Sequence, residues 1–157
     1  MEIRLANIDD YEQIAEMRWQ HAIDEDNDYG ERHTCDIDKD EYIGKVRRFL
    51  TTNQEYKIFV GVENDKVISC MFVYLIPKVP NPNGEDAYIA YLTKVYTLKE
   101  YRGRRVRTQL LDYIKSYLDE MRCELIFVWP SDNSITWYEK NGFSRENEIM
   151  ECILMDK

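Results

Sequence analysis

Hydrophobic positions follow two different spacings along this chain of 157 residues. Two β-branched and aromatic runs, 56–62 and 66–76, are separated by Glu63-Asn64-Asp65 and predict a β-hairpin. Three further segments predict strands, at 3–5, 87–98 and 124–129. Apolar residues that recur every three or four positions predict helices over 11–23, 42–50 and 106–121. The pattern therefore predicts a mixed α and β fold.

Polar residues mark where the first two helices begin. Asn7, Asp9 or Asp10 can cap the first helix, because short polar side chains accept hydrogen bonds from its free amides. Asp38 with Glu41 resembles a capping box and predicts the start of the second helix. These caps divide the first half of the chain into a strand and two helices.

The second half of the chain closes with a short helix and two strands. Ser131 can cap this helix, and Gly142 can end it in a left-handed conformation. Beyond it, Phe143 and the apolar run 149–155 predict a last pair of strands, whereas the acidic segment 24–37 predicts a loop. The whole chain then predicts about seven strands and about four helices.

Composition limits the class of protein. The chain is 44% apolar and 32% charged, and its length suits one hydrophobic core, so we expect a single domain over residues 1–157. No apolar run approaches the ~20 residues of a membrane span, and the N-terminus has no apolar signal segment. We therefore expect a cytoplasmic protein with no membrane partner. The four cysteines stand far apart, and no metal site is predicted.

Charge is unevenly distributed. The net charge of −9 argues against nucleic acid as a partner. Residues 24–41 hold nine acids against two bases, whereas residues 99–107 hold five bases against one acid. The basic stretch favours a bound anion, with a solvated basic face as the alternative.

Two motifs resemble those of the GNAT superfamily of N-acetyltransferases. The strand and basic turn over 95–108 are similar to its acyl-CoA segment, R-x-x-G-x-G, and 137–143 is similar to its Y-E-K-x-G-F signature. Trp129-Pro130-Ser131-Asp132 resembles the W-P-S of one subgroup. The resemblance implies an α/β fold with a mostly antiparallel, twisted sheet whose fourth and fifth strands splay apart. It also implies acyl transfer, usually acetyl transfer, from acetyl-CoA to an amine.

The resemblance assigns roles by position. Val95, Tyr96 and Thr97 would hold pantetheine through their backbone, and Tyr138 would protonate the thiolate leaving group as general acid. Ser131 stands where many members have a cofactor-binding asparagine. The pyrophosphate would be cradled by the turn and the helix start, which comprise Arg102, Gly103, Arg104, Arg105, Val106, Arg107 and Thr108.

The chain departs from the family motif at its two glycines, which are replaced by Arg105 and Arg107. Glycine leaves the backbone amides accessible and adopts positive φ at little cost. The arginines could instead grip the phosphates, and we expect CoA binding to be retained but weakened. The alternative is a non-catalytic binding module whose CoA site Arg105 and Arg107 impair.

The general base and the acceptor are less constrained. Glu63, Glu85 and Asp86 are interpreted as surface carboxylates, and His21 and His33 as surface or helix-end residues. The acidic segment 24–41 favours a cationic acceptor, which could be a small amine, a polyamine or a protein amine. Whether the chain forms a homodimer is left open.

Overall fold

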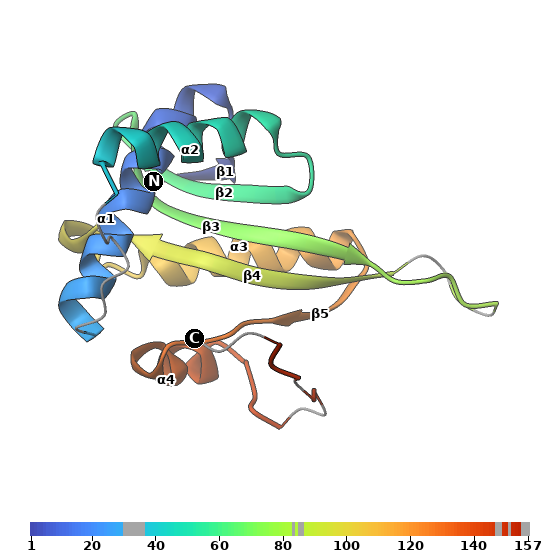
Figure 1. Ribbon diagram of the computed structural model, residues 1–157. Helices are drawn as coiled ribbons and strands as arrows, with labels where there is room; N and C mark the ends of the chain where they lie inside the picture. The colour runs from blue at the N-terminus through green and yellow to red at the C-terminus, as the bar shows by residue number, and fades with distance from the viewer. Residues whose placement is uncertain (30–36, 83, 85–86, 147–148, 151, 155–157) are drawn as a thin grey trace.

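A five-stranded sheet with the order β1-β2-β3-β4-β5 runs through the computed structural model (Figure 1). The structure describes residues 1–29, 37–82, 84, 87–146, 149–150 and 152–154. The strands are β1 (Glu2–Leu5), β2 (Tyr56–Glu63), β3 (Lys66–Pro77), β4 (Tyr88–Thr97) and β5 (Cys123–Phe127). The first four strands pair antiparallel, and β5 pairs parallel to β4.

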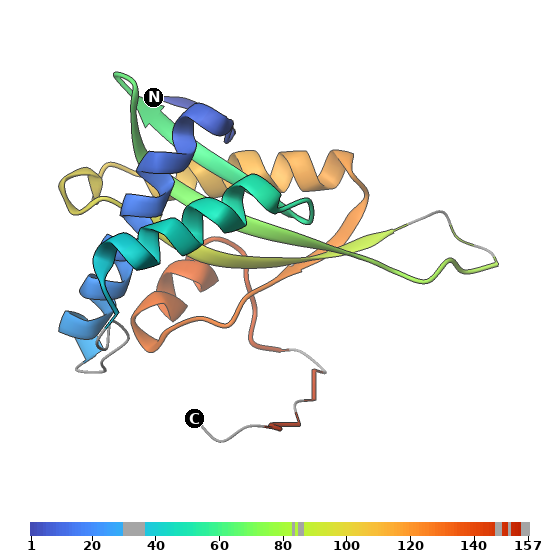
Figure 2. The same ribbon diagram turned by 45° about the horizontal axis from the view of Figure 1, so that its top comes forward.

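Helices cover both faces of the sheet, as Figures 1 and 2 show. The helices are α1 (Tyr11–Tyr29), α2 (Lys39–Thr52), α3 (Val106–Glu120) and α4 (Ile135–Lys140). Ile58 and Val60 of β2 pack in a core with α1 and α2, whereas Phe59 packs in a second core with α3 and α4. Successive residues of a strand point to opposite faces of the sheet. A strand that helices cover on both faces therefore consists of consecutive apolar residues.

The caps predicted at the starts of the first two helical segments are present, but α1 is longer than predicted. Asn7 and Asp10 form a reciprocal capping box, and the Asp38 carboxylate accepts the Glu41 amide at 3.1 Å. The predicted loop at 24–37 is wrong over its first six residues, because α1 continues to Tyr29. No proline or glycine interrupts residues 24–29, and Asp24 is held by tertiary contacts given below. Residues 30–36 of that segment lie outside the described residues.

The prediction of about seven strands is not confirmed, since the sheet has five. Phe143 and the described residues of 149–155 are not in a strand. Met150, Ile153 and Leu154 are largely exposed. An apolar run indicates only that a strand is possible, and it needs a neighbouring strand to supply hydrogen bonds.

The fourth and fifth strands separate, as the resemblance implied. β4 pairs with β5 only from Tyr88 to Tyr91, although β4 continues to Thr97. On its other edge, β4 pairs with β3 along most of its length, with a bulge that places Lys94 and Val95 opposite Met71. Lys94 takes a left-handed conformation, with φ of +52°. The second half of β4 therefore has one edge without a strand partner.

Truncating a side chain in the core that packs against α3 should lower the stability of the protein considerably. Leu110 is fully buried there, and Leu110→Ala should destabilise the protein by about 2–5 kcal/mol through lost burial and a residual cavity. Asp112→Ala, on the exposed face of the same helix, should change stability by less than about 0.5 kcal/mol. Urea unfolding of both variants measures this, and equal effects would contradict the packing described.

Candidate functional site

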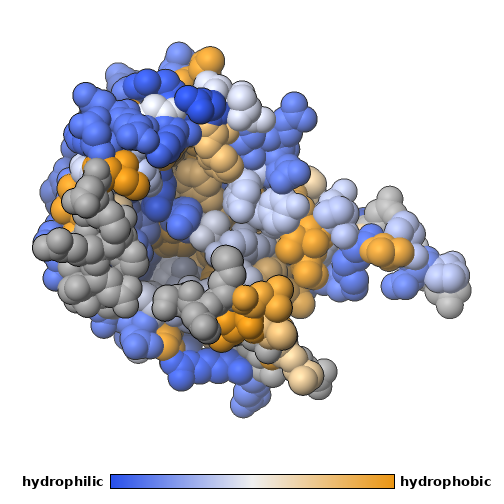
Figure 3. Space-filling view, in the orientation of Figure 1, coloured by the Kyte–Doolittle hydropathy of each residue, from blue (hydrophilic) through white to orange (hydrophobic). Residues whose placement is uncertain are grey.

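A cavity of about 710 Å³ opens where β4 separates from β5. Its walls are the end of α1, the second half of β4, the turn and start of α3, and the segment from Trp129 through α4. The face shown in Figure 3 is hollowed, with hydrophilic and hydrophobic residues around the opening. Its volume lies within the range of cofactor and ligand sites.

The cavity brings together all but one of the residues that the sequence singled out. Those that line it are Val95, Tyr96, Thr97, Arg102, Gly103, Arg105, Val106, Arg107, Thr108, Ser131 and Tyr138. Arg104 does not line it. Its guanidinium lies 3.1 Å from the Glu63 carboxylate and 5.1 Å from the centroid of the Tyr101 ring. The turn therefore directs Arg104 away from the cavity.

The start of α3 is arranged to receive an anion. Gly103 and Arg105 both have positive φ, +76° and +60°, so the chain turns sharply into the helix. Arg105 is the N-cap, and its side chain makes no capping hydrogen bond. The first amides of a helix have no partner within it, and the helix dipole makes them favourable for negative charge. Phosphate groups fit this end of the cavity.

Arg107 enters the cavity from the first turn of α3. Its guanidinium stacks on Trp137 of α4, 3.9 Å from the ring centroid, and Trp137 donates to the Thr108 hydroxyl at 3.4 Å. Burial lowers the pKa of Arg107. Within the described part of the chain, no carboxylate forms an ion pair with Arg107. The guanidinium is thus held in place by an aromatic ring and keeps its charge for a ligand.

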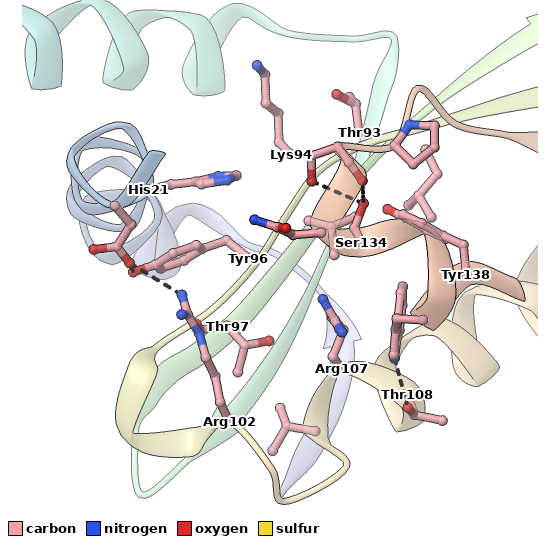
Figure 4. A pocket seen from close by; sticks show the side chains of 18 of the residues that line it. His21, Thr93, Lys94, Tyr96, Thr97, Arg102, Arg107, Thr108, Ser134 and Tyr138 are labelled. Carbon is pink, nitrogen blue, oxygen red and sulfur yellow. Dashed lines mark hydrogen bonds and ion pairs between the residues drawn. The ribbon is translucent and has the colours of Figure 1, made fainter. Parts of the chain in front are cut away.

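Tyr138 lies beside Arg107 and directs its hydroxyl toward the cavity (Figure 4). The residue is buried, and its ring contacts Trp137 and Phe143 edge-on. Burial raises the pKa of Tyr138 to about 12, although the nearby Arg107 opposes the shift. The phenol is therefore protonated at neutral pH and can give up its proton only to a base that forms during a reaction.

Ser131 is in the cavity wall but does not cap a helix through its side chain. Its hydroxyl lies 3.2 Å from that of Ser134, which itself donates to the Ser131 carbonyl at 2.8 Å. Ser131 thus occupies the N-cap of a 3-10 helix over Asp132–Ser134, but its hydroxyl is directed to Ser134 and makes no capping hydrogen bond. The end of α4 agrees with the prediction, since Gly142 follows the C-cap Asn141 with φ of +86°.

Asp24 is buried at the α1 end of the cavity and not on an exposed acidic rim. It accepts the Tyr96 hydroxyl at 2.8 Å, and Lys99 and Arg102 lie 3.0 and 3.3 Å from its oxygens. Arg102 also donates to the Thr97 carbonyl at 3.0 Å. This carboxylate therefore ties α1 to β4 and to the basic turn, and one of the predicted phosphate-binding cations, Arg102, is occupied with it.

His21 is a cavity residue that the sequence interpretation placed on the surface. It stacks on Tyr96, with ring centroids 4.8 Å apart, and contacts Arg18 and Glu25. Burial, with Arg18 and Lys94, lowers the pKa of His21 to about 3, so the ring is neutral. Arg18 can only donate, so Nδ1 accepts and Nε2 donates to Glu25 at 3.2 Å.

The sequence alone could have indicated that Arg18, His21 and Glu25 lie close together. Arg18, His21 and Glu25 are separated by three and four positions, which places them on one face of a helix. The sequence could not predict that these side chains are buried, because their burial depends on the packing of β4 beside α1. Of the other groups that the sequence interpretation placed on the surface, Glu63 pairs with Arg104, whereas His33, Glu85 and Asp86 are outside the described residues.

Comparison with known proteins identifies the family. Residues 11–143 match the profile of the Acetyltransferase (GNAT) family. The chain belongs to the GNAT acetyltransferase family. No curated protein sequence matches this GNAT chain significantly.

Solved structures share the fold of this GNAT protein. A predicted acetyltransferase with acetyl-CoA from Clostridium acetobutylicum has a TM-score of 0.72 at 24% identity, covering 98% of this chain and 96% of that one. Glucosamine-6-phosphate N-acetyltransferase from Arabidopsis thaliana has a TM-score of 0.66 at 18% identity, covering 98% of each chain. The tetramutant BH1408 protein from Bacillus halodurans has a TM-score of 0.73 at 17% identity, covering 98% and 100%. At these identities the likeness shows a common fold.

Among the described residues, no helix is long and apolar enough to cross a membrane. Within the same residues, no group of three or more histidine, cysteine or acidic side chains could hold a metal ion.

The buried Asp24 predicts a pH-dependent contribution to stability. Burial raises its pKa, but hydrogen bonds from Lys99, Tyr96 and Gln20 outweigh this, so the pKa lies below the ordinary value. Asp24→Asn should cost about 1.5–3 kcal/mol at pH 7, the range for hydrogen bonds to a charged group. Because the pKa of Asp24 is lower in the folded protein, its ionised carboxylate stabilises the fold at pH values above the unfolded-state pKa of about 3.9. This stabilisation is lost as the pH falls through the folded-state pKa.

Urea unfolding of wild type and Asp24→Asn from pH 7 down to pH 2 tests this contribution. The difference in unfolding free energy should be largest at pH 7 and shrink below about pH 4. Glu41→Gln is the control, because Glu41 forms only an exposed ion pair with Lys45 on α2. A difference that stays constant over this pH range would show that the Asp24 charge is not what holds these elements together.

Proposed function

We propose that this GNAT protein transfers an acetyl group from acetyl-CoA to a primary amine. The observation that carries the proposal is the cavity at the separation of β4 and β5, which has the uncapped start of α3 at one side and the Tyr138 hydroxyl at another. The family match over residues 11–143 supports it. A solved relative of the same fold is described with acetyl-CoA, which supports the choice of donor.

The lining residues fit the parts of the donor. The amides at the start of α3, together with Arg105 and Arg107, suit its phosphates. The edge of β4 beyond Tyr91 has no strand partner, so backbone groups at 95–97 can pair with the amides of pantetheine. When bound, acetyl-CoA supplies the activated thioester. The chain's contribution is to hold it along β4 and to exclude water.

Proton transfer is assigned to two residues. The amine nitrogen bonds to the acetyl carbon as the carbon–sulfur bond breaks, so one proton leaves the amine and one reaches the sulfur. Tyr138 supplies the second proton, because its phenol stays protonated at neutral pH. Among the described residues, the carboxylates of the cavity lining are Asp24 and Glu25, and Asp24 is occupied by several donors. Glu25 is therefore the carboxylate that accepts the amine proton, directly or through water.

The competing function is a binding module whose donor site the arginines have closed. The cavity is about 710 Å³ with Arg105 and Arg107 both in its wall, which favours an open donor site. Calorimetric titration with acetyl-CoA separates the two proposals. Micromolar binding supports the transferase, and no heat at millimolar acetyl-CoA would favour the binding module.

Tyr138→Phe should lower kcat about 10²-fold or more while CoA affinity and stability change little. Only the phenolic proton is removed, and general acid catalysis typically contributes 10²–10⁴-fold. Acetyl transfer is measured from pH 6 to 10 by release of the CoA thiol, with calorimetry for CoA binding. Tyr113→Phe is the matched control, since Tyr113 lies on the exposed face of α3 outside the cavity. Unchanged turnover across that range would remove Tyr138 from the acid role.

Arg105→Gly should have opposite effects on stability and on CoA binding. Its φ of +60° costs an arginine roughly 1 kcal/mol that glycine does not incur, so the variant should unfold at higher urea concentration. Loss of the guanidinium should weaken CoA binding by about 1.5–3 kcal/mol.

Calorimetry with CoA and with pantetheine locates the effect of Arg105, because only CoA carries phosphates. Arg105→Gly should weaken the binding of CoA and leave the binding of pantetheine unchanged. Arg104→Gln is the control variant, since Arg104 points out of the cavity toward Glu63 and should bind CoA as wild type does. Tighter CoA binding by Arg105→Gly would instead show that the side chain obstructs the phosphates.

A further inference from the structure

Two cations, Lys94 in the cavity wall and Arg18 behind His21, lie near the α1 end of the cavity without an ion pair among the described residues. Arg18 is buried, with 7% of its surface exposed, and its guanidinium donates to the neutral ring of His21. Lys94 lines the cavity from the bulge of β4. Over the residues that the structure describes, neither Arg18 nor Lys94 forms an ion pair with a carboxylate.

Such an arrangement is unfavourable unless something else compensates for it. Removing a guanidinium from water costs several kcal/mol, which a nearby carboxylate normally offsets. The neighbouring groups respond to the uncompensated charge, because Arg18 lowers the pKa of both His21 and Lys94. Burial is the larger cause at both groups, so water does not screen this charge fully. The end of the cavity between α1 and β4 therefore has a positive potential.

The carboxylates nearby do not neutralise these two cations. Asp24 is engaged by Lys99 and Arg102, and it also accepts the Tyr96 hydroxyl. Glu25 accepts from His21, and it is near enough to Lys94 to oppose the lowering of its pKa. Among the described residues, one carboxylate, Glu25, thus lies near two cations, the buried Arg18 and the exposed Lys94, which leaves one positive charge in excess.

We propose that the acceptor carries a carboxylate as well as its amine, and that Lys94, with Arg18 behind His21, holds that carboxylate. The proposal rests on the acetyl transfer proposed above and names the class of its acceptor, an amino acid or a similar zwitterion. The bulge matters because it is where Lys94 leaves the regular alternation of β4. Polyamines are disfavoured, since their second ammonium would face Lys94 and Arg18.

This acceptor class differs from the cationic one that the acidic segment 24–41 favours. The segment's first carboxylate, Asp24, is buried and paired, and among the described residues the other acidic or basic side chains that line the cavity from α1 and β4 are His21, Glu25 and Lys94. What the acceptor meets inside the cavity is thus decided by these side chains and not by the net charge of the segment.

Binding of two small probes of opposite charge tests the anion site without requiring turnover. Succinate and putrescine have the same four-carbon length, one with two carboxylates and one with two amines. Calorimetry should show that succinate binds wild type and that putrescine does not. Lys94→Gln should weaken succinate binding at least 10-fold, and Lys94→Arg should restore most of it. Lys45→Gln, which removes an exposed lysine on α2, should bind succinate as wild type does.

Turnover with matched acceptors tests the substrate class. Each of the twenty L-amino acids is compared with its amide, which keeps the amine and removes the carboxylate charge. At least one acid should be acetylated with kcat/KM at least 10-fold above its amide, and Lys94→Gln should remove that preference by raising KM for the acid.

The outcomes separate this inference from the proposed function. Absence of succinate binding, or equal weakening in Lys94→Gln and Lys45→Gln, overturns the anion site whether or not the protein is an acetyltransferase. Efficient acetylation of amides or putrescine by wild type overturns the acceptor class while leaving acetyl transfer in place. Failure to bind acetyl-CoA, with succinate binding intact and dependent on Lys94, overturns the transferase but keeps the anion site.

Discussion

The rest of the site depends on the fact that β4 cannot pair with β5 along its whole length. β4 keeps its antiparallel ladder with β3, interrupted at Lys94, while the parallel ladder to β5 ends at Tyr91. An unpaired edge in the middle of a sheet must be satisfied by something other than a strand. The divergence therefore provides both the volume of the cavity and the backbone groups that a ligand can use. α3 and α4, which precede and follow β5, place Arg107 and Tyr138 on the walls of that opening.

The electrostatics of the cavity are opposite to those of the whole chain. The protein carries a net charge of −9, but the described residues of the cavity lining include Lys94, Arg102, Arg105 and Arg107 against Asp24 and Glu25, which is four minus two, or +2. These cations are not equivalent. Arg102 is held by Asp24 and the Thr97 carbonyl, so it supports the turn, whereas Arg107 is positioned by Trp137 and keeps its charge for a ligand. Charge alone did not separate these roles, because each depends on the nearest partner.

Much of the fold and part of the site could be predicted from local sequence. The hairpin of β2 and β3, the cap at Asp38 and the glycine after α4 follow from side-chain chemistry acting within a few residues. The basic turn and the 137–143 segment were recognisable because their residue types recur at fixed spacing, and the structure places them around one cavity. The closing pair of strands was not predictable in the same way. Its apolar pattern indicates a strand, but pairing depends on a neighbour distant in the sequence.

By itself, the sequence determined the order of the elements and the concentration of arginines at the start of α3, since these depend on local composition. Only the tertiary structure decided which charges act together. Asp24 lies in an acidic stretch but is buried against Tyr96, 72 residues away, and His21 is neutral because α1 packs beside β4. The interactions of a charged group depend on its burial and on its nearest partners, and both arise from contacts between elements far apart in the chain.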